Sequence, residues 1–181
     1  MKKLKLLILF LFLSASVFAQ KYYTKTGTTE FRASVKAFEP VAARNNSTSA
    51  VLDSKTGNIA ALLFINAFHF KVGLMQEHFN ENYMDANKFP KATFRGKIET
   101  FNFSEILDVK EYPIKGILTV RDEKKEINTT GKFTKQGDKL KLEATFSVKP
   151  EDFNIKIPKI VSKKIAGTIH VTIDYEFIEK K

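Results

Sequence analysis

Residues 165–177 read IAGTIHVTIDYEF, and this stretch decides the fold class. Its odd positions, from Ile165 to Phe177, are all apolar or small, whereas its even positions are polar from Thr168 onward. Because successive side chains of a strand point to opposite faces, this period of two predicts a strand with one buried and one solvated face. The stretch is also well above the usual strand length of about five or six residues.

The same alternation recurs in most of the chain that precedes this stretch. It appears in Thr29–Phe38, Ala92–Ile98, Ile114–Arg121, Ile127–Phe133 and Lys139–Val148. Short polar turns join several of these segments, and consecutive strands joined in this way favour an antiparallel meander. A meander of about eight strands must close or fold over to remove its edges. The sequence therefore predicts an all-β fold, an eight-stranded antiparallel barrel.

Two neighbouring segments depart from the alternation. Ile59–Val72, which a turn separates from the short apolar piece Ala50–Leu52, is apolar on both faces, so we expect one long strand with a covered outer side. The next segment, residues 73–87 (GLMQEHFNENYMDAN), carries Met75, Phe79 and Tyr83 at helical spacing. It predicts one short α-helix inserted between strands, which we expect to lie over the barrel opening or over the doubly apolar strand and to control passage of a ligand.

Residues 1–19 have the anatomy of a secretory signal peptide. Three lysines precede the apolar run LLILFLFL at positions 6–13, and small residues precede a cleavage point after Ala19. The run is shorter than the roughly 20 residues that a membrane span needs. No cysteine follows, so lipoprotein processing is not expected. We therefore expect one mature domain, residues 20–181, located in the periplasm or secreted.

The composition excludes several classes of protein. The chain has no Cys and no Trp, which rules out a disulfide framework, a thiolate metal site and a cysteine nucleophile. Its net charge is +10, with 30 basic against 20 acidic residues, but nucleic acid is not the expected partner of an exported protein. Lysines at outward strand positions, such as Lys97, Lys115 and Lys132, indicate a solvated outer face. Transient contact of these lysines with an anionic membrane surface is a second interpretation.

Candidate catalytic and metal-binding residues are few. His69 and His78 flank the junction of the apolar strand and the helix, and Glu77 and Glu81 lie near them in sequence. The spacing matches no HExxH motif, and we interpret both histidines as locally bonded or solvated. His170 falls on the polar face of the last strand, with no Ser–His–Asp order around it. We therefore predict no enzyme activity, no metal and no cofactor.

The interior of the barrel carries the functional hypothesis. Eight strands enclose a space that side chains can fill or that can hold one small ligand, and the alternation alone leaves both alternatives open. The long strands and the high phenylalanine content favour an apolar pore. We expect its lining to be Phe31, Val35, Phe64, Phe68, Phe70, Met75, Phe79, Phe94, Ile98, Leu118, Val120, Phe133, Leu142, Phe146, Ile169, Val171 and Ile173.

A resemblance adds to this interpretation. Residues 68–84 (FHFKVGLMQEHFNENYM) and 88–98 (KFPKATFRGKI) resemble the signature block of the YceI-like family, and residues 116–120 (GILTV) resemble its next hairpin. The likeness extends over about Thr28–Phe177, with a departure around Pro40–Leu52.

The resemblance implies an extended, lipocalin-like antiparallel barrel that binds polyisoprenoid or related long-chain lipids and is commonly exported. The expected function is therefore a non-catalytic carrier or store for a polyisoprenoid, an isoprenoid quinone or a fatty-acid-like molecule. The alternative is a structural or partner-binding barrel with a side-chain-filled core and no ligand. A homodimer is left open.

Overall fold

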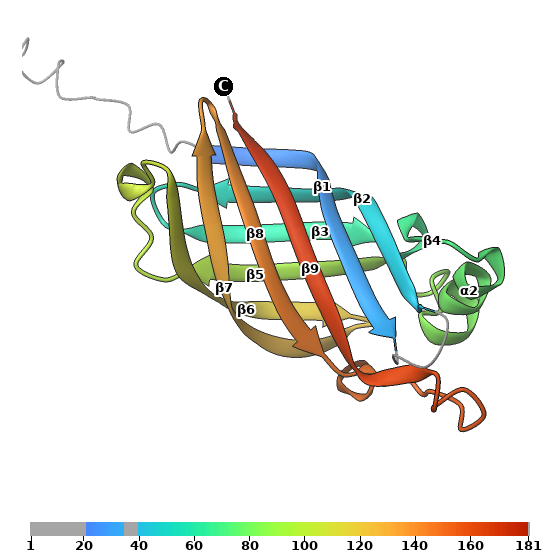
Figure 1. Ribbon diagram of the computed structural model, residues 1–181. Coiled ribbons are helices and arrows are strands. Elements are labelled where there is room, and N and C mark those ends of the chain that lie inside the picture. Colours follow the sequence, from blue (N-terminus) through green and yellow to red (C-terminus); the bar gives the residue numbers. More distant parts are fainter. Residues whose placement is uncertain (1–20, 35–39, 181) are drawn as a thin grey trace, which may run out of the picture.

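The computed structural model describes residues 21–34 and 40–180, which form a barrel with its long strands inclined to one another (Figure 1). The predicted signal peptide and Val35 lie outside these described residues. Within them, eight strands close the ring: β1 (Lys21–Ser34), β2 (Ala42–Asp53), β3 (Asn58–Phe64), β5 (Lys91–Ile98), β6 (Val109–Val120), β7 (Glu123–Gln136), β8 (Lys139–Val148) and β9 (Ile165–Glu179).

All neighbouring strands of the ring are antiparallel, and β1 pairs with both β2 and β9, which closes the sheet. The two-residue strand β4 (His69–Phe70) pairs with β2 outside the ring. The structure thus confirms the predicted fold class, an eight-stranded antiparallel barrel with one short helix. The predicted inward faces of β8 and β9 are also confirmed: Leu142, for example, lies opposite Tyr175, and both side chains are buried.

The N-terminal strands are longer than the sequence indicated. β1 begins at Lys21, eight positions before the expected Thr29, and β2 extends from the apolar piece Ala50–Leu52 back to Ala42. Polar residues disguised both extensions, because inward positions there hold Thr24, Asn45 and Thr48, which are buried. Asn45 is accommodated because its side-chain amide donates a 3.0 Å hydrogen bond to the carbonyl oxygen of Phe64.

The expected single strand Ile59–Val72 is wrong. β3 ends at Phe64, a 3₁₀ turn spans Ile65–Ala67, and the two-residue β4 follows. In an unbroken strand Phe64 and Phe68 would share a face. The 3₁₀ turn reorients the chain between them, so that Phe64 is 45% exposed while Phe68 is buried.

The helix is shorter than the predicted segment 73–87. It consists of α2 (Gly73–His78) and a π-helical turn, η2 (Phe79–Tyr83). The chain leaves the helix because Asp85 adopts a positive φ of 48°, which a continuing right-handed helix excludes. At the other end, the side-chain oxygen of Gln76 accepts a hydrogen bond from the backbone N–H of Phe70, which ties the helix to β4.

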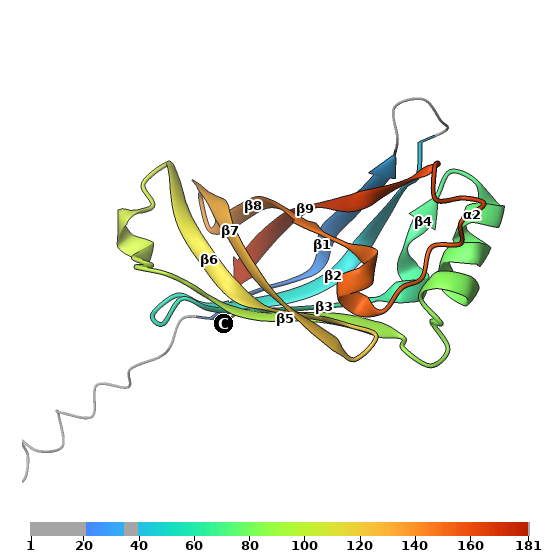
Figure 2. The same cartoon turned by 90° about the horizontal axis from the view of Figure 1, so that it is seen from below.

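The two ends of the barrel are covered differently. At one end, here called the closed end, Phe101, Phe103 and Ile106 from the β5–β6 connection pack on a core that includes Phe133 and Phe177. This connection contains the 3₁₀ turn η3 (Phe103–Glu105). At the other end, called the cavity end, lie α2 and the residues between β8 and β9, as Figure 2 shows. We call residues 149–164 the β8–β9 connection; it contains the 3₁₀ turn η4 (Pro150–Phe153).

A pair of glycines lets an aromatic ring lie flat inside the barrel. Gly96 of β5 and Gly116 of β6 are direct partners, and the ring of Phe94 lies over both. A Cβ on Gly116 would stand 2.5 Å from the Cζ of Phe94 and 2.5 Å from the carbonyl oxygen of Arg95. Phe94 packs against the core of both ends, so the glycines fix the ring that divides the interior.

Gly116→Ala should therefore destabilise the protein by about 1–3 kcal/mol, because the new methyl group overpacks the space under Phe94. The matched control is Gly167→Ala in β9, where an added Cβ would meet nothing within 4 Å and φ is not positive. Urea unfolding of both variants measures the difference. Equal unfolding free energies would contradict this account of the glycine pair.

Candidate functional site

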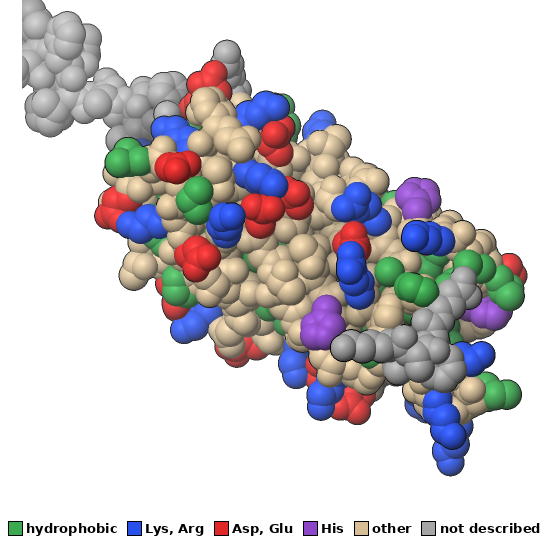
Figure 3. All heavy atoms as spheres, viewed as in Figure 1, with side chains coloured by type: hydrophobic (Ala, Val, Ile, Leu, Met, Phe, Trp, Pro, Cys, Tyr) green, Lys and Arg blue, Asp and Glu red, His purple; other side chains and the backbone are tan. Residues whose placement is uncertain are grey.

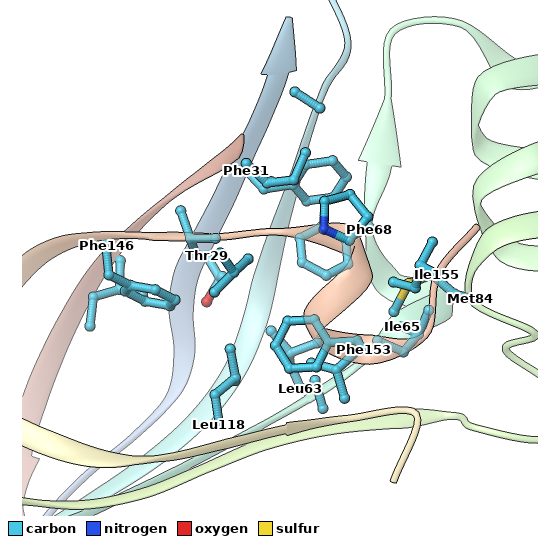
Figure 4. Close-up of a pocket in the computed structure, with 18 of the residues that line it drawn as sticks. Thr29, Phe31, Leu63, Ile65, Phe68, Met84, Leu118, Phe146, Phe153 and Ile155 are labelled. Atoms are coloured by element: carbon cyan, nitrogen blue, oxygen red, sulfur yellow. The ribbon is translucent and has the colours of Figure 1, made fainter. Parts of the chain in front are cut away.

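The cavity end of the barrel encloses a space of about 380 Å³. This volume lies within the range of about 300–1,000 Å³ that is typical of small-molecule sites. Its lining is almost entirely apolar and comes from the inward faces of the strands, from α2 and η2, and from the β8–β9 connection (Figure 4). The barrel is therefore solid at its closed end and hollow at the other.

Four phenylalanines attach the helix to the barrel. Phe79 of η2 stacks on Phe31 of β1 with ring centroids 5.3 Å apart, and it meets the edge of Phe68 at 5.7 Å and Phe70 at 5.1 Å. The apolar stripe predicted for the helix thus buries against rings that come from β1 and from the segment just before the helix. Aromatic pairs at these distances contribute about 0.5–1.5 kcal/mol each beyond area burial.

The β8–β9 connection forms the other cover of the cavity. Phe153 is buried and Ile155 lines the cavity beside it, as Figure 4 shows. A salt bridge of 2.7 Å between Lys125 and Asp152 fixes its first turn, and the Arg121 guanidinium donates to the carbonyl oxygen of Asn154 at 2.9 Å. Hydrogen bonds from Lys125 and from the backbone of Lys149 hold the pKa of Asp152 below its usual value.

The inner end of the cavity contains a small polar group, the hydroxyl cluster of Thr29, Thr48 and Tyr175. The Thr29 hydroxyl lies 3.0 Å from the Tyr175 hydroxyl and 2.9 Å from the Thr48 hydroxyl. All three side chains are buried and line the cavity. Burial raises the pKa of Tyr175, and its hydrogen bonds to the threonines only partly oppose this shift.

Charged side chains reach the cavity only at its rim, within the described residues. Lys149 and Lys164 line it there, and no carboxylate belongs to the lining. Lys149 forms a 3.3 Å ion pair with Glu151. Both lysines and His78 are exposed as well as lining the cavity, so they mark where it reaches the surface.

The comparison with known families agrees with this architecture. The sequence profile of the YceI-like domain matches residues 15–177. The chain belongs to the YceI-like domain family. This confirms the resemblance seen in the signature block of the sequence.

Solved structures show the same YceI-like fold at low sequence identity. A polyisoprenoid binding domain from Saccharophagus degradans, implicated in plant cell wall breakdown, superposes with a TM-score of 0.76 at 11% identity, covering 90% of this chain and 99% of that one. BcnA of Burkholderia cenocepacia gives 0.68 at 14%, covering 83% and 95%. The YceI protein of Campylobacter jejuni gives 0.64 at 19%, covering 80% and 88%. No curated protein matches this sequence.

The structure brings most of the predicted pore residues of this YceI-like barrel together around the cavity. The predicted residues that line it are Phe31, Phe68, Phe70, Met75, Phe79, Phe94, Leu118, Val120, Leu142, Phe146, Ile169, Val171 and Ile173. That these residues contact a ligand remains a prediction.

Three predicted pore residues lie elsewhere. Phe64 points outward because the inward face of β3 holds the alternate residues Ile59 and Leu63, and the 3₁₀ turn that follows brings Phe68, but not Phe64, to the inside. Ile98 and Phe133 point inward as expected, but both are fully buried in the core of the closed end and do not reach the cavity. The alternation gives the face of a residue but not its depth along the barrel axis, which depends on strand register and on what plugs each end.

The lining also includes residues that the sequence did not indicate. The β8–β9 connection contributes Phe153, Ile155, Ile157 and Val161, and β2 contributes Thr48. The spacing of Ile155 and Ile157, two positions apart in an otherwise basic loop, is the sequence feature that could have indicated that this loop lines the cavity. Nothing local marked Thr48, which becomes a lining residue only when β2 closes against β1.

The histidines do not form a centre. His69 is exposed on β4, whereas His78 lies on α2 at the rim of the cavity. The described part of the chain brings no three His, Cys, Asp or Glu side chains together in a way that could hold a metal ion. Within residues 21–34 and 40–180, no helix has the length and apolar character needed to cross a membrane.

Tyr175→Phe should make the protein less sensitive to alkali. The folded state raises the pKa of Tyr175, so the unfolded chain loses this proton first, and stability is retained below the unfolded pKa of about 10 and falls as pH rises above it. Urea unfolding at a series of pH values around and above about 10 measures how the unfolding free energy of the wild type and of the variant changes with pH. A variant slope equal to the wild-type slope would show that Tyr175 does not contribute to the alkaline loss.

Proposed function

We propose that this protein binds a long-chain apolar lipid of the polyisoprenoid type in the cavity, as a non-catalytic carrier or store. The observation that carries the proposal is the apolar cavity of about 380 Å³, open to the surface at its rim, at one end of a barrel whose other end is filled by a cluster of buried side chains. The family match and the neighbour described as a polyisoprenoid binding domain support the same ligand class. An isoprenoid quinone or a fatty-acid-like chain fits the same chemistry.

Apolar burial supplies enough free energy for such binding. Each buried methylene group contributes about 0.8 kcal/mol, so about 20 such groups would give roughly 16 kcal/mol. Lost ligand freedom opposes this with about 4–15 kcal/mol. The lining adds little polar selectivity, because it contains no carboxylate among the described residues and its lysines are confined to the rim. A neutral chain is therefore favoured inside, with any acidic head group outside.

The alternative is a structural or partner-binding barrel without a ligand. It accounts well for the closed end, where Leu52, Phe133 and Phe177 are fully buried. It gives no reason for the cavity end, where Leu118, Phe146 and Ile169 are only partly buried and line the cavity. Native interiors are packed as densely as organic crystals, so a large apolar space in one needs an occupant to be explained.

We also propose that the protein is exported, with residues 1–19 as a cleaved signal peptide. The support is the basic start, the apolar run at 6–13 and the small residues before Ala19. The mature chain should then begin at Gln20. The intact mass of protein recovered from the periplasmic or secreted fraction tests this directly, and retention of Met1 in that fraction would contradict it.

Organic extraction of the purified protein followed by mass spectrometry should yield a co-purifying long-chain lipid. Leu118→Trp, which places a larger side chain in the cavity, should lower the recovered lipid at least tenfold, because the ring occupies volume that the chain needs. Leu118→Met is the control, since it keeps the volume and should keep the lipid. Failure to extract or load a lipid in folded wild-type protein would decide for the ligand-free alternative.

Phe79→Ala should speed ligand exchange. The ring joins the helix to Phe31 and Phe68, and its removal loosens the cover of the cavity without breaking a strand ladder. Because Phe79 is only partly buried, the expected stability loss is about 1–3 kcal/mol, less than for a fully buried ring.

Release of a preloaded fluorescent fatty acid measures the exchange rate. Phe101→Ala is the matched control, because it removes a partly buried ring at the closed end. Equal release rates from both variants and the wild type would show that the helix does not control passage.

A further inference from the structure

The β8–β9 connection has an outer face whose chemistry differs from the rest of the barrel. Between Asp152 and Asp174 the chain carries four lysines, Lys156, Lys159, Lys163 and Lys164, and no acidic residue. All four are exposed, and none forms an ion pair within the described residues. Outside this connection the lysines of the described chain are interspersed with acidic residues, and five of them form ion pairs, such as Lys139 with Glu176 at 2.7 Å.

An apolar side chain stands in the middle of these lysines. Ile160 lies in the turn formed by residues 159–164 and is 88% exposed. In Figure 3 the connection lies at the lower right, where basic side chains gather next to an apolar one. Ile155, Ile157 and Val161 of the same segment line the cavity, so their burial is already explained. The cavity gives no such reason for the exposed position of Ile160.

We propose that this turn is a docking surface for an anionic lipid bilayer, with Ile160 inserted at the interface and the four lysines among the head groups. An exposed apolar side chain within a cluster of cations fits the interfacial region of such a membrane, where apolar burial and charge attraction act together. Docking here would bring the rim residue Lys164, and with it the opening of the cavity, to the membrane surface.

A second exposed apolar residue shows why exposure alone does not define the surface. Leu107 in the β5–β6 connection is also 88% exposed, but it lies next to Asp108 and two positions from Glu105. Lys110 pairs with Glu105 and Asp108 adds a negative charge, so that neighbourhood lacks the excess of cations found in the β8–β9 connection. On the helix side of the cavity opening, Glu77, Glu81 and Asp85 offset the charge of Lys71, Lys88 and Lys91, so the excess of cations lies on the β8–β9 connection. This distribution of charge, and not the apolar cavity, favours a membrane as the partner of this surface.

The absence of Trp from the chain allows a local test. Ile160→Trp and Leu107→Trp each introduce one reporter at an equally exposed position. On addition of vesicles made of equal parts phosphatidylglycerol and phosphatidylcholine, the emission of Ile160→Trp should shift to the blue, and that of Leu107→Trp should not. Phosphatidylcholine vesicles alone should shift neither. Because the signal arises at residue 160, membrane contact through any other segment does not imitate it.

The lysines are tested by affinity. Each contributes about fivefold near an anionic surface, so Lys163→Gln/Lys164→Gln should weaken vesicle binding of the Ile160→Trp protein roughly 10- to 25-fold. Lys97→Gln/Lys115→Gln on the barrel wall should change it less than about twofold. Sedimentation of an Ile160→Ser protein with the same vesicles provides a readout that does not need the Trp.

Several outcomes would overturn the proposal. These are no blue shift with anionic vesicles, an equal shift at both reporter positions, or a shift that grows with protein concentration without vesicles, which would assign the surface to a second copy of the chain. The result is also separable from the proposed lipid binding. If the protein docks on vesicles but yields no extractable lipid, the proposed membrane surface stands and the proposed ligand is excluded. If a lipid is extracted but the protein does not dock, the proposed ligand stands and the membrane surface is excluded.

Discussion

The pairing of β1 with both β2 and β9 is the constraint on which the rest of the structure depends. Once the sheet closes, every inward position of eight strands faces a single interior, and no edge remains to extend. The ring leaves two open ends, and an apolar interior requires a cover at each. What distinguishes this barrel is that the two covers are built differently, and the difference places the cavity.

The division of the interior depends on a few side chains in the middle of the barrel. Phe94 lies over the paired Gly96 and Gly116, and the hydroxyl cluster of Thr29, Thr48 and Tyr175 lies at the inner end of the cavity. On one side the side chains of β6, β7, β8 and β9 meet the plug from the β5–β6 connection and leave no space. On the other side similar residues face a gap. The same strand pattern therefore produces both a packed core and a binding space.

The covers of the cavity lie outside the strand ladders of the ring. The helix is attached through stacked rings, chiefly Phe79 on Phe31, and the β8–β9 connection through the Lys125–Asp152 salt bridge and a few apolar side chains. Neither belongs to a strand ladder, so either can move while the hydrogen bonds of the ring stay intact. Ligand passage and membrane contact thus involve segments whose displacement costs the barrel little.

The sequence by itself determined the strands with clear alternation, their inward faces and the family, because a period of two and a contiguous signature are local properties. It could not show that the apolar segment after Ile59 breaks at a 3₁₀ turn, so it placed Phe64 with Phe68. It also could not separate Ile98 and Phe133 from Phe146, since all three occupy inward positions. Only the tertiary structure decided these points. The depth of a side chain along the barrel depends on register with neighbouring strands and on the plug at each end, and both are contacts between residues far apart in the chain.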